Sequence, residues 1–197
     1  MDLHLGFLAS HRGSNVKSIL DLISTKELDA YPEVIISNNA DSAVLDIAIE
    51  RGIPNYCLNK KNCMDVDEAI AYILKKHDVN LVILAGYMKK IGEKTLNVYP
   101  NRILNIHPSL LPKYGGEGMY GRNIHQSVIN SNDLESGATI HIVNKEYDKG
   151  KIIAQYKIPR YILDTPETLE ERVLKIEHIL YPQTLIDIQK GIISLDL

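Results

Sequence analysis

A strand followed by a helix is a unit that occurs three times in the first ninety residues of this sequence. The first two units begin with an apolar or β-branched run of strand length and the third with a short extended piece, and each continues with apolar residues at helical spacing. The strand segments are residues 3–10, 33–37 and the short 55–59, and a strongly apolar run at 80–86 adds a fourth. This alternation predicts an α/β fold with a single doubly wound, mostly parallel sheet, Rossmann-like and flanked by helices.

The second half of the chain continues the sheet with a different pattern. Residues 102–106 are typical of a further strand. Two strands within 137–158 are separated by a turn-rich link, which indicates an antiparallel hairpin or a functional loop. A last long helix is predicted for about 166–190, with Thr165 as its N-cap and with Pro182 expected to kink or break it.

Length and composition favour one domain, residues 1–197, that needs neither disulfides nor a metal. Hydrophobic residues make up 45% of the chain and charged residues 24%, which argues against disorder. Because no apolar stretch approaches the ~20 residues that span a bilayer and no signal-peptide pattern is present, we expect a cytoplasmic protein. The two cysteines, Cys57 and Cys63, match neither a zinc nor a redox spacing.

The charges are nearly balanced, with 22 basic and 25 acidic residues and a formal net charge of -3. Short lysine pairs are typical of a solvated surface, whereas a nucleic-acid backbone requires a longer basic stripe. We therefore expect small-molecule partners, and neither nucleic acid nor a membrane. The sequence leaves open whether the chain is a monomer or a homodimer.

In open α/β sheets ligands bind beyond the carboxyl ends of the strands. The first such end is SHRGSN, residues 10–15. Gly13 permits a tight turn, and the backbone N–H groups of Ser14 and Asn15 lie at a helix N-terminus, which favours a phosphate. An ordinary capped helix start fits these residues equally well.

A second strand end is LAGYMKKI, residues 84–91. Gly86 would let the backbone approach a flat ligand, and Met88 and Ile91 would form an apolar wall. Taken alone, the segment is only the end of a buried strand.

The third strand end is LNIHPSLLP, residues 104–112. Asn105 and His107 alternate with aliphatic residues, so both polar side chains are expected on one face of the strand. A structural hydrogen bond would also explain such a histidine. Leu111-Pro112 is a candidate for a cis bond, and the sequence does not show the isomer.

A fourth candidate is Asp148, in the turn EYDKG before a strand, where ordinary turn chemistry explains an aspartate. In combination with Asn105 and His107, this aspartate indicates a catalytic site more strongly than it does alone. A carboxylate near an imidazole raises the imidazole pKa and can keep the ring cationic, and a neighbouring amide adds a second donor for a developing oxyanion. This trio suits acyl transfer to an amine.

These motifs, with several others, occur in an order that resembles the folate-dependent glycinamide ribonucleotide formyltransferases of purine biosynthesis. The resemblance covers nearly the whole chain. The motifs are GSN at 13–15, SNNADS at 37–42, LAGYM at 84–88, LNIHPSLLPKY at 104–114, GATIHIV at 137–143, DKG at 148–150 and RVLKIEHILYP at 172–182.

The resemblance implies that Asn105, His107 and Asp148 are catalytic. The amine of the ribonucleotide would attack the formyl carbon of the co-substrate 10-formyltetrahydrofolate directly, without a metal or a covalent enzyme intermediate. Asn105 and protonated His107 would hold the formyl oxygen, and Asp148 would orient His107 and help proton transfer through water. His141 would brace the catalytic histidine or the substrate.

The resemblance also divides the chain between the two substrates. The part up to about residue 100 would bind the nucleotide phosphate, and the rest would carry most catalytic residues and the folate cleft. The implied ribonucleotide-binding residues are Gly13, Ser14, Asn15 and, toward the ribose or glycinamide, Glu177. The implied folate-binding residues are Met88, Lys89, Lys90, Ile91 and Asn105, although an arginine is commoner in the family where Lys89 stands.

Two departures from the family pattern are present. His11 and Arg12 replace residues of the usual SGNGSN opening, and their role in the phosphate loop stays open. The Gly-rich loop at 115–124 is roughly five residues longer than in the family pattern and is expected to be flexible near the cleft. Its conformation and role stay open as well.

Other functions fit the same trio. Formyltetrahydrofolate hydrolase, methionyl-tRNA formyltransferase and sugar-amine formyltransferases are alternatives. Pro108 argues against the hydrolase, whose pattern has a second histidine at that place. A non-catalytic nucleotide- or folate-binding module is a further alternative, because a fold does not determine a function.

Overall fold

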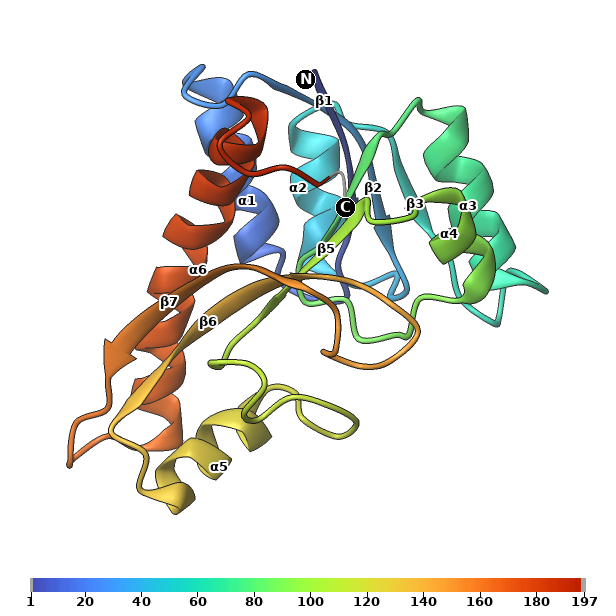
Figure 1. Ribbon diagram of the computed structural model, residues 1–197. Coiled ribbons are helices and arrows are strands. Elements are labelled where there is room, and N and C mark those ends of the chain that lie inside the picture. The colour runs from blue at the N-terminus through green and yellow to red at the C-terminus, as the bar shows by residue number, and fades with distance from the viewer. Residues whose placement is uncertain (1, 196–197) are drawn as a thin grey trace.

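Seven strands form one sheet in the computed structural model, which describes residues 2–195. The strand order is β3-β2-β1-β4-β5-β6-β7; the first five strands are parallel and the last two are antiparallel to their neighbours (Figure 1). The strands are β1 Leu3–Leu8, β2 Ala30–Ser37, β3 Asn55–Cys57, β4 Leu81–Leu84, β5 Ile103–His107, β6 Glu135–Ile142 and β7 Ile152–Pro159. The predicted α/β fold with a mostly parallel, doubly wound sheet is confirmed.

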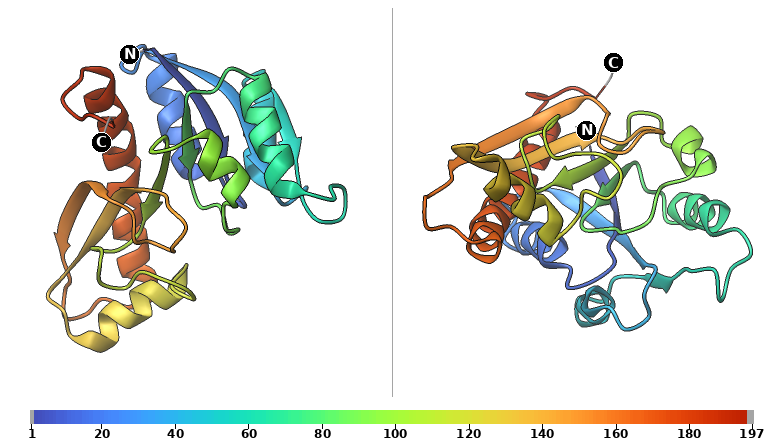
Figure 2. Two further views of the ribbon diagram at one scale, coloured as in Figure 1. Left: turned by 45° about the vertical axis from the view of Figure 1, so that its right-hand side comes forward. Right: turned by 90° about the horizontal axis from the view of Figure 1, so that it is seen from below.

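Six helices flank the sheet within the described residues. They are α1 Ser14–Ser24, α2 Ala43–Glu50, α3 Val66–Lys76, α4 Glu93–Val98, α5 Arg122–Ser131 and α6 Pro166–Gln189. In Figure 1, α1 and α6 lie on one side of the sheet and α3 and α4 on the other. Both views in Figure 2 show α5 and the far end of the β6–β7 hairpin together, beyond the parallel strands.

Each face of the sheet has its own hydrophobic core because side chains alternate along the buried strands. On β4, Leu81 and Ile83 join the core that includes side chains of α1, α2 and α6. Val82 and Leu84 point the other way, into the core that includes side chains of α3. Two-sided burial explains why these strands are continuous apolar runs.

The last helix begins as expected and does not break where expected. Thr165 caps α6 by accepting from the backbone of Thr168, with Pro166 in the first turn. The helix then continues through Pro182 to Gln189, so of the two alternatives predicted at this proline, a kink or a break, the break is wrong. Proline inside a helix costs about 3 kcal/mol, but burial of residues such as Leu185 against the sheet outweighs one missing hydrogen bond.

Two other segments differ in detail from the expectations. Residues 87–92, which follow the predicted strand end at Gly86, have no regular secondary structure, and the short helix α4 follows them. The Gly-rich segment ends earlier than expected, because α5 already begins at Arg122. The turn-rich link between β6 and β7 closes an antiparallel hairpin.

From β1 the chain adds β2 and β3 on one side, and it then crosses back to add β4 on the other side of β1. The loops that follow β1 and β4 are therefore neighbours. The Ser10 backbone N–H donates to the Gly86 carbonyl over 3.1 Å, and the Ser10 hydroxyl accepts from the Met88 N–H over 2.7 Å. These contacts place the GSN and LAGYM motifs at one edge of the sheet.

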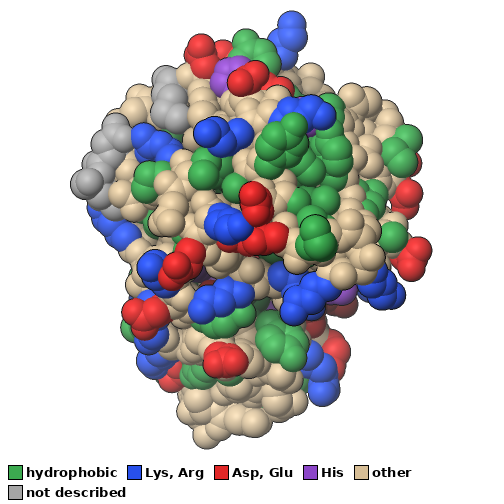
Figure 3. Space-filling view, turned by 90° about the vertical axis from the view of Figure 1, so that its right-hand side faces the viewer, with side chains coloured by type: hydrophobic (Ala, Val, Ile, Leu, Met, Phe, Trp, Pro, Cys, Tyr) green, Lys and Arg blue, Asp and Glu red, His purple; other side chains and the backbone are tan. Residues whose placement is uncertain are grey.

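Surface charge is mixed, as the balanced composition suggested. On the face shown in Figure 3, basic and acidic side chains are interspersed. In residues 2–195 we find no helix with the length and apolar character that crossing a bilayer requires.

Candidate active site

A cleft of about 930 Å³ opens at the carboxyl ends of β1, β4 and β5. Its walls come from both halves of the chain. The structure brings every candidate binding and catalytic residue to this cleft: Gly13, Ser14, Asn15, Met88, Lys89, Lys90, Ile91, Asn105, His107, His141, Asp148 and Glu177. Helix α6 and the β6–β7 loop therefore lie beside the carboxyl ends of β1, β4 and β5 at this cleft.

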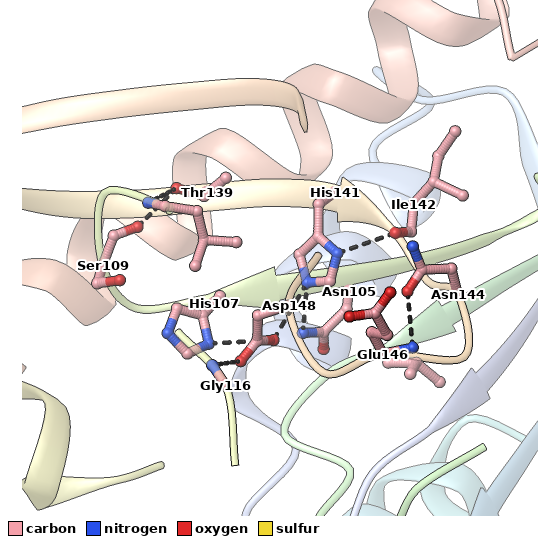
Figure 4. Close-up of polar contacts among 12 residues, drawn as sticks. Asn105, His107, Ser109, Gly116, Thr139, His141, Ile142, Asn144, Glu146 and Asp148 are labelled. Atoms are coloured by element: carbon pink, nitrogen blue, oxygen red, sulfur yellow. Dashed lines mark hydrogen bonds and ion pairs between the residues drawn. The ribbon is translucent and has the colours of Figure 1, made fainter. Parts of the chain in front are cut away.

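Asn105 and His107 lie on the same face of β5, at its carboxyl end. Asn105 pairs with His141 of the antiparallel strand β6, and its Nδ2 lies 3.1 Å from His141 Nε2 (Figure 4). His141 Nδ1 lies 3.0 Å from the Ile142 carbonyl oxygen, which can only accept. His141 Nδ1 is therefore the donor to that carbonyl, and its Nε2 faces both Asn105 Nδ2 and the carboxylate of Asp148.

Asp148 lies between the two histidines, and its backbone has a left-handed φ of 55°. Its Oδ1 is 3.5 Å from His107 Nδ1 and 3.4 Å from His141 Nε2 (Figure 4). Its Oδ2 accepts a 2.9 Å hydrogen bond from the backbone N–H of Gly116. Burial alone would raise the pKa of Asp148, but these contacts outweigh it and lower the pKa below the usual value.

The ring of His107 is buried and both of its nitrogens have partners. Nε2 donates to the Tyr114 carbonyl over 2.7 Å, and Nδ1 faces Asp148. Burial lowers the pKa of His107, and the Asp148 carboxylate and the Tyr114 carbonyl partly offset this lowering. A hydrogen bond from His107 to a substrate oxygen therefore requires that oxygen to replace one of these two partners.

The other end of the cleft is formed by the start of α1. Gly13 has a left-handed φ of 69°, and an added Cβ would lie 2.5 Å from Val44 Cγ2, so only glycine fits this turn. Asn15 Nδ2 donates to Glu177 Oε2 over 2.6 Å, whereas Asn15 Oδ1 has no hydrogen-bond partner within residues 2–195. Burial raises the pKa of Glu177 to about 7.

Glu177→Gln should make thermal stability less dependent on pH. A carboxyl whose pKa rises from 4.5 to about 7 on folding stabilises the protein fully below pH 4.5 and loses that contribution as the pH rises through 7. The rise corresponds to about 3 kcal/mol. Between pH 5 and 8, the melting temperature of the variant should rise relative to that of the wild type. A difference in melting temperature that does not change with pH would contradict the raised pKa of Glu177.

The segment after β4 forms the remaining wall. Ile91 is buried, whereas Met88, Lys89 and Lys90 are exposed. Lys90 Nζ lies 5.3 Å from the ring centroid of Tyr147, in the loop that carries Asp148. His11 and Arg12, the departures from the family pattern, are exposed and line the cleft beside the start of α1.

Three groups at the candidate site were not predicted from the sequence. The Tyr114 carbonyl and the Gly116 N–H contact His107 and Asp148 through the backbone. His125, on α5, is buried at the cleft, and its pKa is lowered to about 4 by burial and by the charge of His107. Only the glycines that follow Tyr114 hinted at a close backbone approach. Among the described residues, no group of three or more His, Cys, Asp or Glu side chains is arranged to hold a metal ion.

The protein is an α/β protein that carries an amide, an imidazole and a carboxylate at the carboxyl end of its mixed sheet. This arrangement is typical of an enzyme that transfers an acyl group. The sequence profile of the formyl transferase family matches residues 4–185. The chain belongs to this family of enzymes, as its motifs had indicated.

Named relatives and solved structures agree with this membership. The chain is 38% identical to phosphoribosylglycinamide formyltransferase of Haemophilus influenzae over 90% of its own length and 83% of the relative's. It is 38% identical to the chloroplastic enzyme of Arabidopsis thaliana, and there the match spans 92% of this chain but only 63% of that protein. The structure of glycinamide ribonucleotide transformylase 1 from Symbiobacterium toebii superposes with a TM-score of 0.89 at 33% identity, covering 96% and 89% of the two chains.

Proposed function

We propose that this enzyme transfers the formyl group of 10-formyltetrahydrofolate to the amine of glycinamide ribonucleotide in purine biosynthesis. The products are formylglycinamide ribonucleotide and tetrahydrofolate. The observation that carries the proposal is the meeting of Asn105, His107 and Asp148 in a cleft that also holds the N-terminus of α1. Relatives named phosphoribosylglycinamide formyltransferase support the same substrate.

The ribonucleotide occupies the end of the cleft formed by α1. Gly13, Ser14 and Asn15 bind the phosphate, because the free N–H groups and the dipole of a helix N-terminus attract an anion. Glu177 faces the ribose or the glycinamide. The unpartnered Asn15 Oδ1 supports this placement, since a hydroxyl or amide N–H of the ligand would satisfy it.

The reaction begins when the amine nitrogen attacks the formyl carbon. A carbon–nitrogen bond forms and the carbonyl electron pair moves onto the oxygen. Asn105 donates a hydrogen bond to this oxyanion, and protonated His107 supplies positive charge and a ring N–H once the oxygen displaces one of its present partners. The intermediate then collapses, the bond to the folate nitrogen breaks, and Asp148 helps move the amine proton to that nitrogen through water.

The folate lies along the segment after β4. Met88 and Ile91 form the apolar wall for its ring system, and Lys89 and Lys90 provide cations for its carboxylates. The substrates are small molecules, and we propose that the enzyme works in the cytoplasm as a monomer or homodimer. His141 acts as a brace for Asn105 and Asp148.

A spectrophotometric assay tests the proposal. Purified protein with glycinamide ribonucleotide and a 10-formyl folate should release the deformylated folate, seen as a change in absorbance. Release that does not require the ribonucleotide would indicate a hydrolase, and release only with another amine would indicate a different formyl acceptor. Binding of both ligands without any release would indicate a non-catalytic module.

His107→Ala should separate chemistry from binding. Loss of the imidazole removes the charge beside the oxyanion, so kcat should fall by about 10²- to 10³-fold. The dissociation constant for the ribonucleotide, measured by calorimetry, should stay close to that of the wild type because its phosphate binds at α1. Turnover at the wild-type rate would remove His107 from the mechanism.

A further inference from the structure

Tyr114 has an unusual backbone conformation next to the reaction centre. Its φ of 57° lies in the left-handed region, which is costly for a residue with a Cβ. Its carbonyl accepts the 2.7 Å hydrogen bond from His107 Nε2. Such a conformation persists only where its surroundings hold it in place.

The phenol of Tyr114 is hydrogen-bonded to two residues at the C-terminal end of α5 and just after it. Its hydroxyl donates to Asp133 Oδ2 over 2.7 Å and lies 2.5 Å from Ser131 Oγ. Asp133 is itself paired with Lys113 Nζ at 2.8 Å, and its backbone carbonyl accepts from Arg160 Nε. The phenol of Tyr114 is therefore fixed by hydrogen bonds, while the backbone carbonyl of the same residue contacts His107.

This contact determines how the imidazole of His107 is oriented and protonated. A neutral imidazole has one N–H, and the Tyr114 carbonyl requires it on Nε2. Nδ1 of the neutral ring then presents a lone pair to Asp148, and uptake of a proton turns that contact into an ion pair. The Gly116 N–H holds the other carboxylate oxygen of Asp148, so the chain at 114–116 contacts both members of the pair.

We propose that Tyr114 is a positioning residue for formyl transfer, acting through its backbone carbonyl on His107 while Asp133 anchors its phenol. The carbonyl sets the plane of the imidazole and favours its protonated form. The effect on turnover rests on the proposed function, whereas the effect on His107 itself does not. The titratable groups that face His107 are Asp148 from the β6–β7 loop, His141 from β6 and His125 from α5.

Tyr114→Phe tests the anchor by removing one hydroxyl. In the ¹⁵N-labelled full-length protein, imidazole NMR should show the Nε2–H form of His107 in the wild type. In the variant its pKa should fall by about one pH unit, the shift expected when a hydrogen bond to a charged imidazole is weakened. In the assay kcat should fall about tenfold with KM for the ribonucleotide unchanged. The alkaline limb of the kcat profile should move to lower pH, since less His107 stays protonated.

Matched variants separate positioning from general destabilisation. Asp133→Asn keeps an acceptor for the phenol and should retain the wild-type titration of His107. Asp133→Ala leaves the phenol only Ser131, so it should shift the titration in the same direction as Tyr114→Phe. Tyr56→Phe removes a hydroxyl that contacts His77 far from the cleft and should leave His107 unchanged.

An unchanged His107 titration in both Tyr114→Phe and Asp133→Ala would overturn the proposal. An equal shift in Tyr56→Phe would overturn it as well, because the effect would then be global. If the wild type turns over no ribonucleotide, the proposed function fails, and the NMR titrations still decide whether Tyr114 positions His107.

Discussion

Asp148→Asn is expected to lower kcat by about 10³-fold while the protein stays folded. The asparagine oxygen can still accept from the Gly116 N–H, so the loop keeps its hydrogen bond. The negative charge beside His107 and His141 is lost, and the pKa of His107 falls further because burial is no longer opposed by a carboxylate. Less imidazolium is then present to stabilise the oxyanion or to exchange a proton with the folate.

Steady-state kinetics, calorimetry with the ribonucleotide and melting curves together check this expectation. The melting temperature and the ribonucleotide affinity should change little, so the loss should appear in kcat alone. Asp46→Asn is a suitable control, because this exposed residue of α2 undergoes the same chemical change away from the cleft. A variant that keeps wild-type kcat would show that Asp148 has no part in the chemistry.

Gly150→Ala is expected to have the largest effect on stability, a loss of about 3–5 kcal/mol. A Cβ at this position would lie 1.6 Å from the carbonyl oxygen of Ile142, and a backbone atom cannot move aside as a flexible side chain can. The Ile142 N–H donates to the Lys151 carbonyl next to this contact, so the β6–β7 hairpin must open or shift. Because Asp148 lies two residues earlier, the same shift should also reduce activity.

Thermal and denaturant unfolding measure this loss, which should lower the melting temperature by about 10 °C for a chain of this size. Gly191→Ala is the matched control. That glycine has a φ of 72°, but no atom lies within 4 Å of an added Cβ, so only about 1 kcal/mol of backbone strain is expected. Equal losses in the two variants would show that the close approach to Ile142 is not the cause.

The candidate site was predictable in part because two of its residues follow a local rule. Asn105 and His107 are two positions apart on a strand, so their shared face follows from the pleat alone. The convergence of Asp148 and Glu177 with them was inferred from resemblance, since no local pattern links Asn15 with a residue 162 positions away. The backbone contacts of Tyr114 and Gly116 could not be foreseen, because irregular loops have no period from which to infer them.

The alternation of strands and helices and the turn at Gly13 follow from the amino-acid sequence without any knowledge of tertiary contacts. Each of these depends on side-chain period or on the backbone freedom of a single residue. Three features depend on the folded structure: α6 continues through Pro182, Asp148 lies between His107 and His141, and Tyr114 is held in a left-handed conformation against His107. These features depend on packing and hydrogen bonds between segments distant in the chain, whose combined stabilisation outweighs local preference.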